Sequence, residues 1–323
     1  MTVGIERVKV EAAPAIAARG DWEEFRQRFR RDRLAVAGAA FLILLTLLAL
    51  LGAPLVARST GYGPDQQSYA GLDINGLPIS PLQRELAADG VTPDPNGPFH
   101  VLGTDRLGRD ILVRLLYGAR ISLLVAFAAT GGALLIGVPL GLIAGYFRGV
   151  SDAVISRAID TMVAFPSMLF AIGLAAVLGP GLLNVVVVII LFSWYYPARI
   201  VRTAVLSLRG EQFVEAAISA GSSDLRIIFG HLLPHLTAPI IVYSTGIIAS
   251  NILFEAGLSY LGLGVPPPAP SWGQMLSDGV AGGLYRIQPW LAVIPGLALA
   301  LTTLSFNQLG DGIRDAFAPR GGL

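Results

Sequence analysis

Long uncharged stretches alternate with short charged ones along this chain. Five segments contain no Asp, Glu, Lys or Arg, namely residues 34–57, 121–147, 161–198, 227–254 and 287–310. A helix needs about 20 apolar residues to cross a bilayer core that is about 30 Å thick. Residues 161–198 would extend about 57 Å as a single helix, and Gly179-Pro180-Gly181 interrupts them. The pattern therefore predicts an all-α polytopic membrane protein with six transmembrane helices.

The uncharged segments divide the chain into parts of different character. Residues 21–33 are charged and aromatic, which predicts a helix at the membrane surface. Residues 58–100 have many Gly, Pro, Asp and Asn and no helical period, which predicts an outer loop with turns such as the one at 94–97. The expected parts are residues 1–33 (cytoplasmic segment), 34–57 (first transmembrane helix), 58–120 (extracytoplasmic loop), 121–310 (five-helix core with a cytoplasmic loop at about 199–235) and 311–323 (cytoplasmic tail).

Composition and charge agree with this organisation. The chain is 54% hydrophobic and 14% charged, whereas an ordinary soluble domain is about 25% charged. With both termini inside, 16 of the 23 Lys and Arg residues lie on the inner side, and six of the other seven fall in the long 58–120 loop, where charge counts weakly. Arg114 and Arg120 run against this orientation. The distribution favours two cytoplasmic termini. The first span is too long for the apolar region of a signal peptide, so we expect it to stay uncleaved.

Glycines in the second span repeat at a helical spacing. Gly137, Gly141 and Gly145 recur every four residues on one face, which lets another helix approach closely. We expect this span to pack against protein, with a partner subunit on the glycine-lined face. Pro139 allows a kink in the same helix.

The residues before the second span include several charged side chains. Thr104 or Asp105 is expected to cap a helix that continues through Ile111. Asp105, Arg109 and Asp110 raise the possibility of a metal or catalytic site. Capping and local ion pairing explain these residue types better, and we favour that interpretation.

A polar segment at residues 211–236 separates two apolar stretches. Its first part, EQFVEAAISA, has a helical pattern that Gly221 ends, and Ser222 or Ser223 is expected to cap a second helix starting near Asp224. Helices that rest on a membrane usually present Lys or Arg beside bulky apolar residues. This helix has alanines and acidic residues instead, so docking to a protein partner is favoured over a surface helix or a solvated loop.

The same segment resembles the EAA loop of permease subunits in bacterial ABC importers. The pattern is Glu215-Ala216-Ala217, three residues, Gly221, nine residues, and His231-x-Leu233-Pro234. The general pattern has an aliphatic residue in place of His231, and the dipeptide/oligopeptide/nickel branch commonly has His there. Four further stretches resemble that branch in the same order, and the similarity covers about residues 26–318: RFRRDRLAVAG, LGTDRLGRDILVRLLYGARISL, GLIAGYFRGVSDAVISRAIDTMVAFPSML and GLSYLGLGVPPPAPSWGQML.

The resemblance implies a fold, a function and partners. It implies the type I ABC importer permease fold, a C-type subunit in the bacterial inner membrane, and one half of a heterodimeric pore. The residues that would form the element coupled to a cytoplasmic ATPase are Glu215, Ala216, Ala217, Gly221, Leu233 and Pro234. The implied partners are a second permease subunit, one or two ATPase subunits, an extracytoplasmic binding protein and membrane lipid, without nucleic acid. Dipeptides or oligopeptides are the expected substrates; nickel, glutathione and oligosaccharides are alternatives. Residues 58–100 look longer than the family needs.

Catalysis by this chain itself is not expected. A phosphate-binding P-loop needs a lysine, and the only lysine is Lys9 in the N-terminal segment. We therefore expect no cofactor here, with ATP and magnesium bound by the partner ATPases. Gly257-Leu258-Ser259 is followed by Leu261 where a serine-hydrolase elbow needs glycine. The sequence also shows no internal inverted repeat of the kind that secondary transporters often carry.

Two polar residues in the fifth span are candidates for the transport pathway. Ionisable groups inside a membrane are functional candidates by default, and Glu255 lies one helical turn from Asn251. Glu255 either meets the substrate near the outer face or is an interfacial acid that reaches water. His231 and His235 are expected to cap or pair locally, because two imidazoles without carboxylates make a poor nickel site. The absence of cysteine excludes disulfides and Cys-ligated metals.

Overall fold

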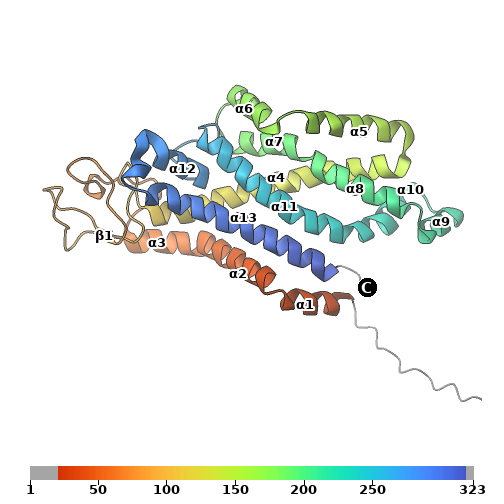
Figure 1. The fold of residues 1–323 in the computed structure, drawn as a ribbon, viewed down its shortest axis with the longest axis horizontal. Coiled ribbons are helices and arrows are strands. Elements are labelled where there is room, and N and C mark those ends of the chain that lie inside the picture. Colours follow the sequence, from red (N-terminus) through yellow and green to blue (C-terminus); the bar gives the residue numbers. More distant parts are fainter. Residues whose placement is uncertain (1–20, 318–323) are drawn as a thin grey trace, which may run out of the picture.

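A computed structural model describes residues 21–317 of the chain, almost all of them helical apart from one long loop (Figure 1). The helices are α1 (Asp21–Arg31), α2 (Arg33–Leu47), α3 (Ala53–Thr60), α4 (Ile111–Phe147), α5 (Gly149–Ala164), α6 (Ser167–Leu178), α7 (Leu182–Ser193), α8 (Tyr195–Leu208), α9 (Gln212–Ser219), α10 (Asp224–Arg226), α11 (Leu233–Tyr260), α12 (Trp272–Val280) and α13 (Trp290–Phe317). Shorter turns are the π-helical η1 (Leu48–Gly52) and η3 (Ile227–Leu232) and the 3₁₀ turns η2 (Tyr69–Gly71) and η4 (Ala281–Arg286). Strands β1 (Gln83–Arg84) and β2 (Phe99–His100) pair antiparallel. Lys9 and Arg320, with most of the expected cytoplasmic segment 1–33 and the end of the tail, lie outside the described residues.

The predicted all-α membrane architecture is confirmed. Five helical runs are long and apolar enough to cross a membrane: Arg33–Thr60, Ile111–Phe147, Leu182–Leu208, Asp224–Tyr260 and Trp290–Phe317. The sixth span exists if α5 and α6, which are bent by 88° relative to each other, form one crossing. The bend follows from Pro166, because the residue before a proline is driven out of the helical conformation and Phe165 adopts φ −92° and ψ 140°. The predicted break at Gly179-Pro180-Gly181 separates α6 from α7.

The second span begins ten residues earlier than the sequence predicted, at Ile111. Neither Thr104 nor Asp105 caps it. Asp110 does so, accepting a 2.8 Å hydrogen bond from the Val113 amide. Arg114 and Arg120 are tolerated in this helix because their guanidinium groups reach other backbone: Arg114 donates to the Pro64 carbonyl at 2.8 Å, and Arg120 donates to the carbonyls of η1.

The glycine-lined face of α4 is filled by α8 of the same chain. A Cβ atom built at Gly141 would lie 2.6 Å from the Ala198 carbonyl oxygen, and one at Gly145 would lie 2.6 Å from the Val205 Cβ atom. The prediction that this span packs against protein is confirmed. The expectation that a partner subunit covers this face is wrong, because the sequence shows the spacing of small residues but not which helix answers it.

The predicted surface helix at 21–33 corresponds to α1, which is followed at once by α2. Asp32 separates the two helices and caps α2, accepting from the amides of Leu34 and Ala35. The Phe25 ring packs on the Phe317 ring with centroids 4.5 Å apart. This helix therefore packs on the end of α13, and Figure 1 shows it beside that end.

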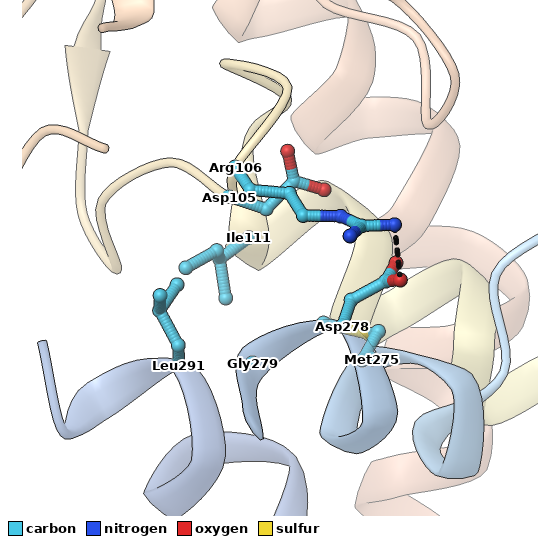
Figure 2. A pocket seen from close by; sticks show the side chains of 7 residues that line it. All are labelled: Asp105, Arg106, Ile111, Met275, Asp278, Gly279 and Leu291. Carbon is cyan, nitrogen blue, oxygen red and sulfur yellow. Dashed lines mark ion pairs between the residues drawn. The ribbon is translucent and has the colours of Figure 1, made fainter. Parts of the chain in front are cut away.

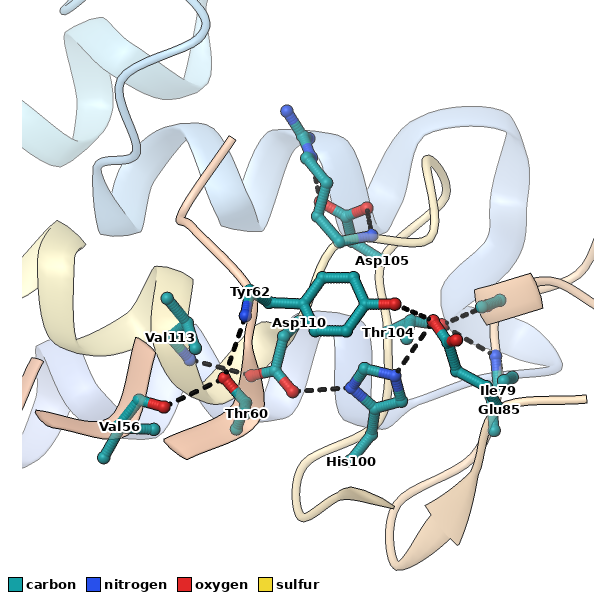
Figure 3. Close-up of polar contacts among 12 residues, drawn as sticks. Val56, Thr60, Tyr62, Ile79, Glu85, His100, Thr104, Asp105, Asp110 and Val113 are labelled. Carbon is teal, nitrogen blue, oxygen red and sulfur yellow. Dashed lines mark hydrogen bonds and ion pairs between the residues drawn. The ribbon is translucent and has the colours of Figure 1, made fainter. Parts of the chain in front are cut away.

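The loop at residues 61–110 is a folded unit at the end of the molecule opposite α9 (Figure 1). At its centre the fully buried His100 ring lies 2.6 Å from the Asp110 carboxylate through Nδ1. The Tyr62 hydroxyl donates a 2.5 Å hydrogen bond to Glu85, which lies 3.6 Å from the other His100 nitrogen (Figure 3). Burial, and then the hydrogen bond to the Glu85 carboxylate, raise the pKa of Tyr62 above its usual value. The predicted turn at 94–97 is confirmed, since the Gly97 amide donates to the Asp94 carbonyl at 3.0 Å.

Ion pairs tie this loop to the helix before the last span. Arg106 lies 3.1 Å from Asp278 of α12, and Arg109 lies 3.4 Å from the same carboxylate. Figure 2 shows the Arg106 side chain reaching across to Asp278. Arg109 also pairs with Asp105 at 2.7 Å, so the local ion pairing expected for these residues is confirmed.

Candidate functional site

The polar segment between α8 and α11 lies at the end of the molecule away from the folded loop (Figure 1). Its first helix, α9, starts after Glu211, which has an extended backbone with φ −79° and ψ 146°. The Glu211 carbonyl accepts from the amides of Val214 and Glu215 at 3.0 and 3.2 Å. The predicted helix at 211–220 is thus present and slightly shorter.

Gly221 ends α9 in the manner that the sequence predicts. Its φ is +77°, a left-handed conformation that favours glycine. The Ser222 amide donates to the Ala217 carbonyl at 3.1 Å, and the Gly221 amide donates to the Ile218 carbonyl at 2.9 Å. These two bonds form a Schellman cap. A Cβ atom at Gly221 would meet no atom within 4 Å, so the backbone conformation and not the space requires glycine here.

One side of α9 is anchored in the protein and the other is exposed. Val214 and Ala217 are buried. They belong to an apolar cluster with residues of α4, α8, η3 and α11, which are Leu142, Tyr146, Val201, Val205, Ile227, Ile228, Leu232 and Leu236. Glu215 and Ala216 are exposed. Of the predicted coupling residues, Ala217 therefore anchors the helix, while Glu215 and Ala216 remain available to a partner.

The second half of the segment is tied to the end of α4. Asp224 begins α10 and accepts a 2.7 Å hydrogen bond from the Tyr146 hydroxyl. The Arg209 guanidinium lies 5.5 Å from the centre of the same ring. Ser223 holds the predicted cap position with extended backbone, but its side chain makes no capping bond. The bond to Tyr146 was missed because it joins residues that are 78 positions apart.

The chain enters the fifth span through η3, which sequence analysis did not predict. The His231 carbonyl accepts from His235 Nδ1 at 2.7 Å, and the His235 ring stacks on Phe213 with centroids 4.7 Å apart. The expected local pairing of the histidines is confirmed. Leu233 packs against the apolar cluster beneath α9, whereas Pro234 is exposed at the start of α11.

The two pathway candidates lie inside the chain, between α11 and α4. Glu255 is 0% exposed, and its carboxylate accepts from Ser259 at 2.6 Å and from Ser122 at 3.0 Å. Asn251 is buried and donates to the Thr130 hydroxyl at 2.9 Å. The alternative in which Glu255 reaches water at the interface is wrong. A role of either residue in transport stays a prediction.

The segment offers an exposed surface for contact. Among residues 21–317, no group of three or more His, Asp or Glu side chains is arranged to hold a metal ion. What the segment presents is a short helix with an exposed acidic and apolar side, including Ile218 at 48% exposure. Its buried side is fixed to three long helices. This arrangement suits the transfer of a movement from a docked protein to the membrane spans.

Comparison with known protein families agrees with these features. Residues 137–321 match the family model described as the binding-protein-dependent transport system inner membrane component. Residues 21–78 match the model described as the N-terminal transmembrane domain of oligopeptide transport permease C.

Individual relatives extend over nearly the whole chain. It is 42% identical over 299 residues to the dipeptide transport system permease protein of Alkalihalophilus pseudofirmus, covering 93% of this chain and 90% of that one. It is 39% identical over 305 residues to the glutathione transport system permease protein of Pectobacterium atrosepticum, covering 94% and 93%. Among solved structures, a MetNI methionine ABC transporter chain in an inward-facing conformation matches with a TM-score of 0.53 and 19% identity, over 64% of this chain and 97% of that one. The last match supports the fold.

Proposed function

This chain belongs to the inner membrane components of binding-protein-dependent transport systems, with an N-terminal span of the oligopeptide permease C type, and from that premise we propose that it is one half of a heterodimeric pore that imports short peptides. It is a non-catalytic, multi-pass permease subunit of an ABC importer. The proposal adds a second permease subunit as its partner, and cytoplasmic ATPase subunits that hold ATP and magnesium. It also places both termini and the segment at residues 209–232 in the cytoplasm.

The observation that carries the proposal is the asymmetry of α9. Its exposed side, with Glu215 and Ala216, is free to enter a cleft in an ATPase subunit. Its buried side, with Val214 and Ala217, is held by α4, α8 and α11. Movement of the ATPase subunits during ATP hydrolysis would displace α9 and, through these anchors, the spans. The Schellman cap at Gly221 fixes the angle at which the chain leaves α9.

A short peptide is the proposed substrate class. Relatives named for dipeptide transport and for glutathione transport have almost the same identity to this chain, 42% and 39%. Dipeptides and glutathione both contain amide bonds and free carboxylates, so both belong to the class of short peptides. We favour dipeptides or oligopeptides, with glutathione as the second candidate.

Transport by the complete complex tests the proposal. The complex would be purified through a tag on this chain, placed in lipid vesicles and supplied with its binding protein, ATP and magnesium. Uptake of labelled alanyl-alanine and of labelled glutathione would be measured in parallel. We expect uptake of alanyl-alanine that needs both ATP and the binding protein. Uptake that persists without ATP would contradict the ABC mechanism. Uptake of glutathione without uptake of alanyl-alanine would identify glutathione as the substrate.

A further inference from the structure

Three large grooves lie along the membrane-spanning part of the described chain, and one of them differs from the others in chemistry. One, between α4 and η3, is lined by Leu, Ile, Val, Phe and other apolar residues, including Leu135. Another, between α2, α11 and α13, is mainly apolar and includes Ile43, and its polar residues are Thr46, Ser244 and Thr245. The third, which we call the polar groove, has a volume of about 390 Å³ and is bordered by α6, α7, α8, α11 and α13. Its polar residues are Ser167, Ser193, Tyr196, Tyr243, Ser250, Asn251 and Asn307.

The position of these polar groups argues that the groove faces water. Tyr196 is 52% exposed and Tyr243 is 42% exposed, and Asn307 is exposed as well. All three lie within runs that are long and apolar enough to cross the membrane. Polar groups that face hydrocarbon cost several kcal/mol each when unsatisfied, so polar groups within spans line water-filled cavities or face protein. The apolar grooves, by contrast, suit lipid chains.

Not all the polar groups have free hydrogen-bonding capacity. The Ser193 and Ser250 hydroxyls donate to carbonyls of their own helices, at 2.6 and 3.0 Å. Asn251 donates to Thr130. The hydroxyls of Ser167, Tyr196 and Tyr243 and the amide of Asn307 are the other polar groups in the lining that a passing solute would meet. The Arg314 guanidinium lies 5.6 Å from the Tyr243 ring centre, toward the end of α13, and it is not among the residues that line the groove.

We propose that the polar groove is this chain's half of the path for the solute, and that it contacts the amide groups of a peptide through neutral hydrogen bonds. None of the described residues that line it is Asp, Glu, Lys, Arg or His. Neutral donors and acceptors match peptide amides and do not select for the charge of a side chain. The proposal rests on the function proposed above. It also separates the two earlier candidates, since Asn251 borders the groove and Glu255 does not.

Gly246 supplies the width of the groove. It lies on α11 within the lining, and a Cβ atom there would meet no atom within 4 Å. A larger side chain at this position would enter the groove without striking the rest of the chain. Gly131 is a matched control, because it is also helical, meets no atom within 4 Å and lines the apolar groove beside α4.

The first test uses thiol labelling, for which the absence of cysteine is an advantage. Ser250→Cys and Asn307→Cys would be compared with Leu135→Cys, which is 79% exposed in the apolar groove. The complete complex in lipid vesicles would be treated with a charged methanethiosulfonate reagent. We expect the two polar-groove thiols to react at least tenfold faster than the control. Equal or slower reaction would overturn the proposal, because the groove would then be covered by lipid or by the partner subunit.

The second test fills the groove. We expect Gly246→Leu to lower ATP-driven uptake of alanyl-alanine at least tenfold while ATP hydrolysis and co-purification of the subunits stay within twofold. Gly131→Leu should transport like the unmodified complex. Unchanged uptake by Gly246→Leu would overturn the proposal. Failure of the proposed function would look different: the unmodified complex would not take up alanyl-alanine with ATP, whereas thiol labelling would still report whether the groove holds water.

Discussion

The hydroxyl of Tyr146, at the end of α4, donates a 2.7 Å hydrogen bond to the carboxylate of Asp224, at the start of α10. This bond connects α4, the longest of the described helices, to the segment that carries α9. The Arg209 guanidinium also lies over the ring of Tyr146. The bond therefore fastens the start of α10, five residues after the end of α9, to α4.

Removing this hydroxyl is expected to weaken coupling more than folding. Tyr146→Phe keeps the ring and loses one hydrogen bond to a carboxylate, worth about 1.5–3 kcal/mol of stability. We expect the complex to assemble and to hydrolyse more ATP per molecule of peptide imported. The rate of ATP hydrolysis divided by the rate of peptide uptake would be measured in lipid vesicles. Tyr260→Phe, at the last residue of α11, is the control. An unchanged ratio would show that the Tyr146–Asp224 bond carries no movement.

Gly221→Leu tests the backbone conformation after α9. A residue with a side chain costs roughly 1–2 kcal/mol in the left-handed conformation, which glycine holds here at φ +77°. We expect insertion to be intact and uptake to be abolished, because α9 leaves its position relative to the ATPase. Gly221→Asn should recover part of the uptake, since asparagine tolerates this conformation.

The control for that variant is Gly210→Leu, two residues before α9. A Cβ atom there would lie 3.9 Å from the Ser207 carbonyl oxygen, an ordinary contact. Normal uptake by a well-assembled Gly221→Leu complex would contradict the role of this segment in coupling.

Glu255 provides a test between a structural role and a role in the pathway. Glu255→Gln keeps groups that can bond Ser122 and Ser259, so folding and uptake should be retained. Glu255→Ala leaves both hydroxyls without their acceptor and opens a cavity, at an expected cost of about 3 kcal/mol. Thermal unfolding of the purified complex would measure the difference. If Glu255→Gln unfolds normally but fails to transport, the pathway hypothesis is favoured instead.

The folded loop at residues 61–110 should lose stability in alkali because of Tyr62. Its pKa is raised by burial and by the Glu85 carboxylate, so the folded state keeps the proton that the unfolded chain loses near pH 10. The stabilisation is fully present below that pH and is lost as the pH rises through the higher folded pKa. Unfolding midpoints between pH 8 and 11 should fall more steeply for the unmodified chain than for Tyr62→Phe. Parallel curves would contradict the assignment.

Local signals in the sequence predicted local features well. Gly221 identified the end of α9 because the left-handed conformation is a property of one residue, and Gly179-Pro180-Gly181 identified a break for the same reason. The stripe at Gly137, Gly141 and Gly145 predicted a close contact. It did not identify α8 as the neighbour, because that pairing depends on the path of the chain through some 50 intervening residues.

Features built from distant residues were not predicted. His100 sits between Asp110 and Glu85 in a loop without any periodic pattern, so composition suggested only turns. Asp105 and Asp110 both suit a helix cap, and the choice between them depends on Arg109 and on Asp278 in α12. Glu255 looked like an interfacial acid because its serine partners, Ser122 and Ser259, are distributed over α4 and α11.

The contact of α4 with α8 has a consequence for how motion crosses the membrane. At Gly141 and Gly145 the backbone of α4 packs directly against the Ala198 carbonyl oxygen and the side chains of Val201 and Val205 on α8, so the two helices are in close contact and should move together. The two helices would therefore move as one rigid pair. In the proposed orientation, α9 follows the cytoplasmic end of α8, and the folded loop precedes the outer end of α4. A displacement of α9 would then tilt α4 and α8 together. The folded loop, which is ion-paired to α12 through Arg106 and Asp278, would move with them.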